Sequence, residues 1–499
     1  MTSPASYRFA PRDRTGWVLG LSGPQVVAIG GALLLAVMAA SHGVNLVAAA
    51  IPVLVGVGVA FGRVGGRPLM EAAPSAARWA LRAVRKQNRW QPSLTDEPDA
   101  GDLPLPPPLD GLELLAVDGA VYDPTAAGRQ VGVVYDPTTR TFAATFPVVG
   151  SQFALTDRVE QDRLLALWGD AMAGFCQERG PVAWVRWAEC AAPAGYAEQL
   201  RYLAEHGHGD ISDPAVASYR SLLAAAGPLS TRHEVFVTVA LAAERVTIGR
   251  RHGGDLKTGC SEVLLAQLRL FAARLDSAGL VVGPPLSPEE TRSALQARLD
   301  PTAAPSADDR CQTLAERAGL VSASGRWPAS ADACWSRWVV DLSLHRSYHV
   351  VEWPRLEVGP DWLAAVLLWA GAVRTVAVIC EPVAPRRSHR AIERDATKLA
   401  SDEEHRRSKG FRVSAHHRRA QADVEERESQ LVSGYGEFTY AGIISLSAPD
   451  SEALERACEE LVQVAGGCGL VLSALDGRHG EGVAACLPVA RALAPSRMV

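Results

Sequence analysis

The stretch HGGDLKTGC, residues 252–260, carries the most suggestive chemistry in this chain, a Lys257–Thr258 pair between an apolar run and an amphipathic one. Such a pair ends the phosphate-binding loop of nucleotide hydrolases, G-x-x-x-x-G-K-[ST], whose glycines let backbone N–H groups close around phosphates. The two required glycine positions hold Arg251 and Leu256 instead. The pattern fails at both positions, so we expect no nucleotide hydrolysis by this chain and a flexible loop at GGDLKTG, residues 253–259.

The other residue types that often perform chemistry are scattered. The histidines lie in short isolated groups without the partner cluster that a metal ion needs. No nucleophile elbow supports a Ser-His-Asp triad, and the nine cysteines form no C-x-x-C pair, which favours small core residues in a reducing compartment. We therefore predict no catalytic residue, no cofactor-binding residue and no metal ligand, and hence no enzyme. The isolated groups are EHGHGD (His206, His208), HRSYH (His345, His349) and GRHGEG (His479).

Length and composition are those of an ordinary folded protein. The 499 residues suffice for two or three domains, and 48% are hydrophobic and 21% charged. The formal net charge of −5 provides no overall attraction for nucleic acid. Basic residues are dense from Arg386 to Arg427, but acidic residues interleave them at helical spacing, in two expected helices split near Gly410. This mixture is typical of ion-paired helices or of a protein docking surface, and it argues against nucleic-acid contact.

The N-terminal region is uncharged over an unusual length. Residues 24–62 contain no Asp, Glu, Lys or Arg, and SHGVN at 41–45 is their only polar cluster. A spanning helix needs about 20 apolar residues, so the stretch predicts a transmembrane hairpin of two short helices rather than a secretory signal peptide. Arginines flank it on both sides, which predicts a two-pass inner-membrane protein with a cytoplasmic tail at 1–23 and the bulk of the chain in the cytoplasm.

A basic amphipathic helix is expected next, at residues 63–90. Arg78, Arg82, Arg85 and Arg89 recur at helical spacing, and Trp79 and Trp90 lie at the rim of this basic face. Beside a membrane exit, such a helix is predicted to be a membrane-interface anchor on anionic lipid. The alternative is an ordinary solvated helix face. The acidic, Pro-rich residues 91–108 are typical of a stiff linker.

Two later segments repeat one order of expected elements. Residues 109–300 and 331–499 each show a strand pair, a helix, a strand, two helices, a strand, a helix and a strand, and a linker at 301–330 joins them. The predicted fold class is therefore α+β: a two-helix transmembrane hairpin followed by two tandem, pseudo-repeated α+β units. The tryptophans of the second unit are expected mostly in its core, with one or two as interface anchors.

Several stretches resemble known secretion proteins. The apolar hairpin with GRPLMEAAPSAARWALRAVRKQNRW resembles PrgI-like inner-membrane subunits of conjugative, type IV-like secretion systems. ATFPVVGSQFALTDRVEQDRLLALWGDAM, VAWVRWAE and SYRSLLAAAGPLSTRHEVFVTVAL resemble the N-terminal, non-motor domain of their large transfer ATPase, as does FRVSAHHRRAQADVEERESQLVSGYGEFTYAGIISLSAPDSEALERACEEL. The fused arrangement, with WPRLEVGPDWL, is similar to a family of actinobacterial membrane proteins. In the ATPase family a P-loop domain follows, whereas here the sequence ends, so the resemblance implies a motor on a separate chain.

The resemblance implies a non-catalytic inner-membrane scaffold of a conjugation or type IV-like secretion machine. Its expected partners are membrane lipid, a separate cytoplasmic P-loop ATPase, other secretion-system subunits and further copies in a homo- or hetero-oligomer. One alternative is an EccE-like membrane subunit of type VII secretion, which would accompany an FtsK-like ATPase. Another is a membrane-tethered hydrolase, which would need a deep polar pocket with a perturbed carboxylate or histidine.

Overall fold

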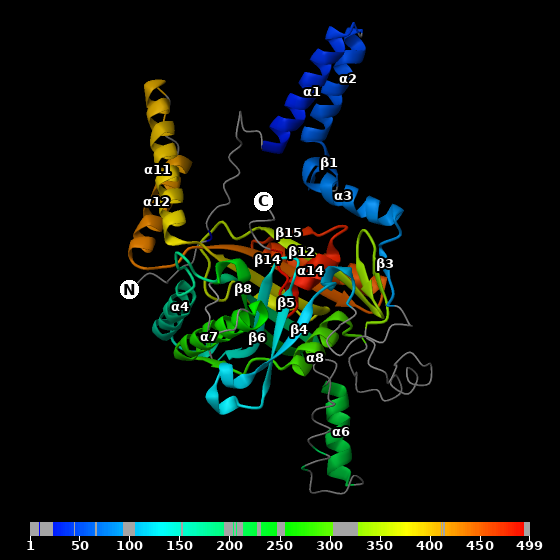
Figure 1. The fold of residues 1–499 in the computed structure, drawn as a ribbon, viewed down its shortest axis with the longest axis vertical. Coiled ribbons are helices and arrows are strands. Elements are labelled where there is room, and N and C mark those ends of the chain that lie inside the picture. The colour runs from blue at the N-terminus through cyan, green and yellow to red at the C-terminus, as the bar shows by residue number, and fades with distance from the viewer. Residues whose placement is uncertain are drawn as a thin grey trace.

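The fold is a mixed helix–strand fold built on one large sheet of 13 strands (Figure 1). The predicted linker at 301–330 lies largely outside the described residues, as does His208. The computed structural model describes residues 9, 23–43, 45–64, 67–92, 105–150, 153–193, 203, 206, 213–226, 231–246, 255–302, 328–410, 412 and 415–493.

The first half of the sheet comes from residues 113–282. Its β5–β6 turn is built by DPTT as the turn chemistry predicts: the Asp136 carboxylate accepts hydrogen bonds from Thr138 N at 2.9 Å and Thr139 Oγ1 at 3.0 Å. The strands are β4 Glu113–Asp118, β5 Gln130–Asp136, β6 Thr141–Gly150, β7 Val182–Pro193, β8 Thr231–Ala242 and β9 Leu280–Val282. The helices are α4 Arg158–Ala173, α6 Pro214–Ala226, α7 Leu256–Ser277 and α8 Pro288–Leu299.

The second half comes from residues 331–486. The helix expected after the first strand pair of this segment, at PDWLAAVLLWAG (residues 360–371), is only one turn, α10 Ala364–Leu367. A further helix, α14, follows the last strand. The strands are β10 Ala331–Ala333, β11 Trp338–Val340, β12 Ser343–Glu352, β13 Val373–Pro382, β14 Phe438–Ala448 and β15 Val471–Ala474. The other helices are α11 Pro385–Ser408, α12 Ala415–Val432, α13 Ser451–Gly467 and α14 His479–Cys486.

The same strand order occurs in both halves. In the first half it is β6-β8-β7, with β9 paired to β6, and in the second it is β12-β14-β13, with β15 paired to β12. The halves join where β7 pairs with β13, and the strand pairs that the structure describes are antiparallel. The two sequence segments are therefore two parts of one continuous sheet, and not successive units behind a membrane hairpin.

Helices cover both faces of the sheet because successive side chains of a strand point to opposite faces. On one face, α4 and α7 pack on the first half, and α10 and α13 pack on the second. On the other face, α8, α14 and the residues after α14 form a core that contacts strands of both halves. This shared core ties the end of the chain to the first half of the sheet.

The predicted transmembrane hairpin is wrong. The segment forms two helices, α1 Gly23–Ser41 and α2 Leu46–Phe61, but among the described residues no helix combines the length and the apolar character needed to cross a membrane. The 16 residues of α2 are about 24 Å long at 1.5 Å per residue, whereas the hydrocarbon core is about 30 Å thick. The predicted two-pass inner-membrane localisation is overturned by the same finding.

The predicted loop at residues 253–259 is also wrong where the structure describes it. Asp255 is the N-cap of α7, and its carboxylate accepts a hydrogen bond from Thr258 N at 2.9 Å. An aspartate at this position satisfies free N–H groups of the first turn, which is why helix begins at Leu256. Lys257 forms an ion pair with Glu113 and lies 5.6 Å from the centre of the Tyr135 ring. These contacts place the lysine against β4 and β5.

Candidate docking surface

The basic helix predicted at 63–90 is mostly α3, Leu69–Val84, and its first tryptophan faces the protein. Trp79 Nε1 donates a hydrogen bond to the Ala333 carbonyl at 3.1 Å, and its ring lies edge-on to Trp335 with centroids 5.6 Å apart. A Cβ at Gly477 would lie 2.9 Å from the Trp335 ring, so the absence of a side chain there makes room for this contact. Trp79 therefore anchors α3 to the second half of the sheet.

The second tryptophan of the predicted rim also contacts the body. Arg89 and Trp90 form the short strand β3, which pairs with β10, and Trp90 packs partly buried against the shared core. Arg89 is mostly exposed and lies 3.5 Å from Asp332. Arg82 is half-buried and lines a groove, whereas Arg78 and Arg85 are exposed. The structure thus separates the predicted set: the tryptophans and Arg89 contact the sheet region, and two arginines face outward.

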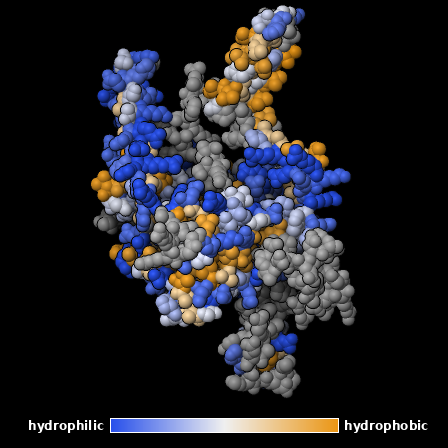
Figure 2. All heavy atoms as spheres, in the orientation of Figure 1, coloured by the Kyte–Doolittle hydropathy of each residue, from blue (hydrophilic) through white to orange (hydrophobic). Residues whose placement is uncertain are grey.

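The paired helices α1 and α2 project from the body and expose an apolar surface (Figures 1 and 2). They pack closely on each other through small residues, since a Cβ at Gly56 would lie 2.4 Å from the Ala32 Cβ. Exposed apolar patches of this kind mark interaction sites. The exposed large side chains are Val27, Leu33, Leu34, Leu35, Val37, Met38, Ile51, Leu54, Val55, Val57, Val59 and Phe61.

The helices α11 and α12 form a second projection, which we call the charged arm (Figure 1). The predicted split near Gly410 is confirmed, and this glycine has φ 72°, the left-handed conformation that glycine adopts easily. Of the 24 residues of α11, only Ser388 and Ile392 are buried. The arm is therefore held together largely by polar contacts. Its ion pairs include Arg406–Asp402 at 2.9 Å, Arg407–Glu403 at 2.5 Å and Arg427–Asp395 at 3.2 Å.

An open groove of about 3140 Å³ is lined by the charged arm and by the sheet next to it. Its wall on the arm mixes both signs of charge, for example Arg394, Lys398 and Asp402. Its wall on the sheet side includes the aromatic side chains of Trp353 and Tyr440. A surface with interleaved charges and partly buried aromatic rings suits a protein segment, because aromatic anchors within a polar rim are what protein interfaces use.

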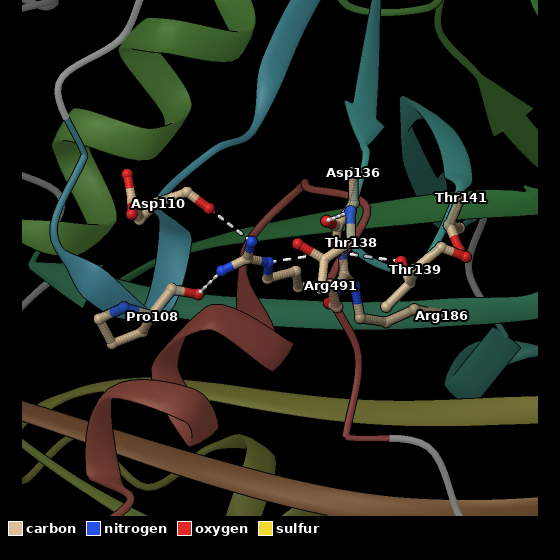
Figure 3. A network of polar contacts seen from close by, with 8 residues as sticks. All are labelled: Pro108, Asp110, Asp136, Thr138, Thr139, Thr141, Arg186 and Arg491. Carbon is tan, nitrogen blue, oxygen red and sulfur yellow. Dashed lines mark hydrogen bonds and ion pairs between the residues drawn. The ribbon is translucent and has the colours of Figure 1, made fainter.

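A buried arginine holds the end of the chain on the sheet. Arg186 of β7 donates hydrogen bonds to the carbonyls of Ala485, Val489 and Arg491 at 3.0 to 3.1 Å and to Thr238 Oγ1 at 3.2 Å. Burial lowers the pKa of Arg186 to about 9, so it stays protonated at neutral pH. The side chain of Arg491 holds the same segment in place as well. It donates to the Pro108 carbonyl at 2.7 Å and lies 3.2 Å from Asp136 (Figure 3).

A buried ion pair holds the junction between the halves on the opposite face. Arg374 of β13 donates from Nη2 to both carboxylate oxygens of Glu189 on β7, at 2.9 and 3.1 Å. His233 Nδ1 lies 2.6 Å from the same carboxylate. Arg374 also donates to the carbonyls of Leu367 and Trp369 at the end of α10. The two halves are thus joined by polar contacts on both faces of the β7–β13 junction.

A buried histidine sits in the second half with both ring nitrogens occupied. His345 Nε2–H donates to the Leu299 carbonyl at 2.7 Å, and Nδ1 accepts from Ser447 Oγ at 2.7 Å. The side chain is fully buried, and burial lowers the pKa of His345 to about 4. The ring is therefore neutral at pH 7 and links the end of α8 to β12 and β14.

Acid is expected to destabilise the fold through His345. The unfolded chain takes up this proton near pH 6.5 and the folded chain near pH 4, so the stabilisation is complete above pH 6.5 and is lost as the pH falls towards 4. Between pH 7 and pH 5 this corresponds to about 2 kcal/mol. Urea unfolding at both pH values should show a drop larger by this amount in the wild-type protein than in His345→Gln. An equal drop in both proteins would contradict the assignment.

The buried polar groups act as structural ties between elements. Ser347, for example, is fully buried, with its N–H donating to His479 Nδ1 at 3.2 Å and its hydroxyl 3.1 Å from Ser445 Oγ. Burial raises the pKa of the Cys380 and Cys486 thiols to about 12, so both stay protonated at neutral pH. Across the described residues, no three His, Cys, Asp or Glu side chains are grouped as metal ligands.

The surfaces most suited to function are therefore the charged arm with its groove and the apolar hairpin α1–α2. The sequence indicated both segments. It did not predict where the groove lies, or that Trp79 and Trp90 contact the second half of the sheet. In the comparisons no family model matches the chain, and no curated protein matches it in sequence.

Proposed function

We propose that this chain is a non-catalytic docking scaffold of a conjugation or type IV-like secretion machine, and that the charged arm is the surface on which a separate P-loop ATPase docks. The observation that supports this most is the arm itself. It projects from the sheet, and α11 buries only two of its 24 residues, so its length contributes little to the core of the chain. Contact with a partner explains such an arm better than a contribution to the stability of the fold does.

The charge pattern of the arm favours a protein partner. Binding to a phosphate backbone needs a surface on which positive charge is not neutralised. Here Arg406, Arg407 and Arg427 are each paired with an acidic residue of the arm. Exposed residues of both signs remain along the helices, for example Arg390, Glu404 and Glu425. Such a surface can match a partner with a complementary charge pattern, which sets specificity and orientation.

The apolar hairpin supports the assembly part of the proposal. Side chains such as Val27 and Leu54 are 74% and 71% exposed. A patch of this size stays exposed in few isolated proteins, because burying apolar surface is favourable. We infer that α1–α2 contacts other subunits of the same machine.

Removing the outer part of the arm should release the ATPase. The variant replaces residues 396–426 with a short Gly-Ser turn, which keeps the Asp395–Arg427 ion pair at the base of the arm. The tagged protein is purified from its native cells, and the proteins that accompany it are measured by quantitative mass spectrometry. We expect the wild type to retain a P-loop ATPase and the variant to lose it at least about tenfold, which corresponds to about 1.4 kcal/mol of binding free energy.

A charge-swapped pair elsewhere provides the matched control. Glu452 and Arg456 form an exposed i,i+4 pair on α13, 3.2 Å apart, and Glu452→Arg/Arg456→Glu changes surface charge without touching the arm. This control should retain the ATPase. If the wild type recovers no ATPase above background, the docking role is wrong. Recovery of an FtsK-like ATPase with type VII membrane subunits would instead favour the EccE-like alternative.

A further inference from the structure

Three aromatic side chains surround Phe9, the one described residue of the N-terminal 22. The Phe9 ring stacks on Trp353, with centroids 5.1 Å apart and planes 26° apart, and it lies edge-on to Trp362 at 5.1 Å. Tyr440 lies at 6.2 Å. The three come from different places: Trp353 follows β12, Trp362 precedes α10, and Tyr440 is on β14. Phe9 thus sits in a pocket formed by tertiary structure.

The rings of the pocket also contact one another. Trp353 and Trp362 are edge-on to each other at 6.2 Å, and Trp353 and Tyr440 at 5.2 Å, so the three rings form a connected wall. Trp353 lies close to β14 at Gly442, where a Cβ would be 2.8 Å from the ring. Any larger residue would displace the indole. The geometry of the wall therefore depends on a glycine within β14.

We infer that this pocket, which we call the aromatic pocket, is a binding site for an aromatic side chain, and that Phe9 of the chain's own N-terminal segment is its ligand. Aromatic pairs at these distances, stacked or edge-on, are each worth about 0.5–1.5 kcal/mol beyond the area that they bury. Phe9 makes two such contacts, with Trp353 and Trp362, and a third, tilted one with Tyr440.

The contact has a structural consequence for the apolar hairpin. Phe9 precedes α1, and Trp79, which packs on Trp335, lies in α3 after α2. The hairpin is therefore flanked in sequence by two aromatic anchors, and both bind to the second half of the sheet. The aromatic pocket fixes one side of this attachment.

The test is a peptide titration into the full-length chain. In Phe9→Ala the pocket loses its own ligand, and a synthetic peptide of residues 2–16, TSPASYRFAPRDRTG, supplies it from solution. Isothermal titration calorimetry should show saturable binding to Phe9→Ala and binding at least about tenfold weaker to the wild type, because the linked Phe9 competes at a high effective concentration. The same peptide with alanine in place of phenylalanine should not bind.

A second variant separates the pocket from the rest of the surface. Gly442→Val in the Phe9→Ala chain should abolish peptide binding by displacing Trp353, whereas the exposed pair variant Glu452→Arg/Arg456→Glu in the same chain should bind normally. Circular dichroism confirms that each protein is folded. A folded Phe9→Ala chain without saturable binding would overturn the inference, as would equal affinity for the two peptides. Should Gly442→Val not fold, Trp362→Ala takes its place with the same expected loss.

Discussion

Replacing Arg186 by alanine is expected to lower the free energy of unfolding by about 3–5 kcal/mol, because two buried carbonyls and a partly buried one lose their donor. The guanidinium is fully buried and donates to Ala485, Val489 and Arg491, which lie at the end of the described chain. The change should therefore also loosen residues 487–493. Urea unfolding followed by tryptophan fluorescence measures the first effect, and amide hydrogen exchange of residues 480–493 measures the second.

Arg245 provides the matched control for this prediction. It is an exposed arginine that follows β8, and it donates to a single carbonyl, that of Val182, at 3.0 Å. Arg245→Ala should cost no more than about 1 kcal/mol, since the arginine is exposed and a single hydrogen bond is lost. If Arg186→Ala costs as little as Arg245→Ala, the buried arginine does not hold the end of the chain on the sheet.

Local features of the fold could be predicted from the sequence because neighbouring residues determine them. DPTT makes the β5–β6 turn through Asp136, and Asp213 with Pro214 begins α6, where Ala215 N donates to the Asp213 carboxylate at 2.8 Å. The strands at VAWVRWAEC and HEVFVTVAL appear as β7 and β8. In each case the signal lies within a few residues of the structure that it specifies.

The position of the site could not be predicted, because its contacts join residues far apart in the chain. Arg186 meets Ala485 across 299 residues, and Trp79 meets Ala333 across 254. A charged residue inside an apolar run, as Arg186 in VAWVRWAE or Arg374 in VRTVAVI, does indicate a buried partner, but it does not say which one. The sequence around Phe9 does not indicate its contacts, because Trp353, Trp362 and Tyr440 come together only when the sheet forms.

The apolar N-terminal stretch shows how a composition signal can mislead. Absence of charge over 24–62 and the polar cluster at 41–45 predicted two helices correctly, but not whether either helix can cross a membrane. The described helices end at Ser41 and begin again at Leu46, and Pro52 lies inside the second one. Composition averages over the stretch, whereas a membrane crossing depends on the length of each separate helix.

Removing one partner of the Glu189–Arg374 pair is expected to cost about as much as the loss of Arg186. Both side chains are almost fully buried, at 5% and 0% exposure, and Glu189→Leu leaves the Arg374 charge without its carboxylate. A buried charge that loses its partner costs about 3–5 kcal/mol. Because the pair joins β7 to β13, the change should weaken the junction between the two halves of the sheet. Urea unfolding gives the free energy, and hydrogen exchange of β7 and β13 locates the change.

The double variant Glu189→Leu/Arg374→Leu distinguishes an ion pair from simple packing. It removes both charges, so it should cost no more than Glu189→Leu alone, although the carbonyls of Leu367 and Trp369 lose their donor. Additive costs of the two single changes would mean that Glu189 and Arg374 act independently. Strong coupling would mean that the junction is held by the pair as a unit. The two halves of the sheet would then depend on a contact that only the folded chain can make.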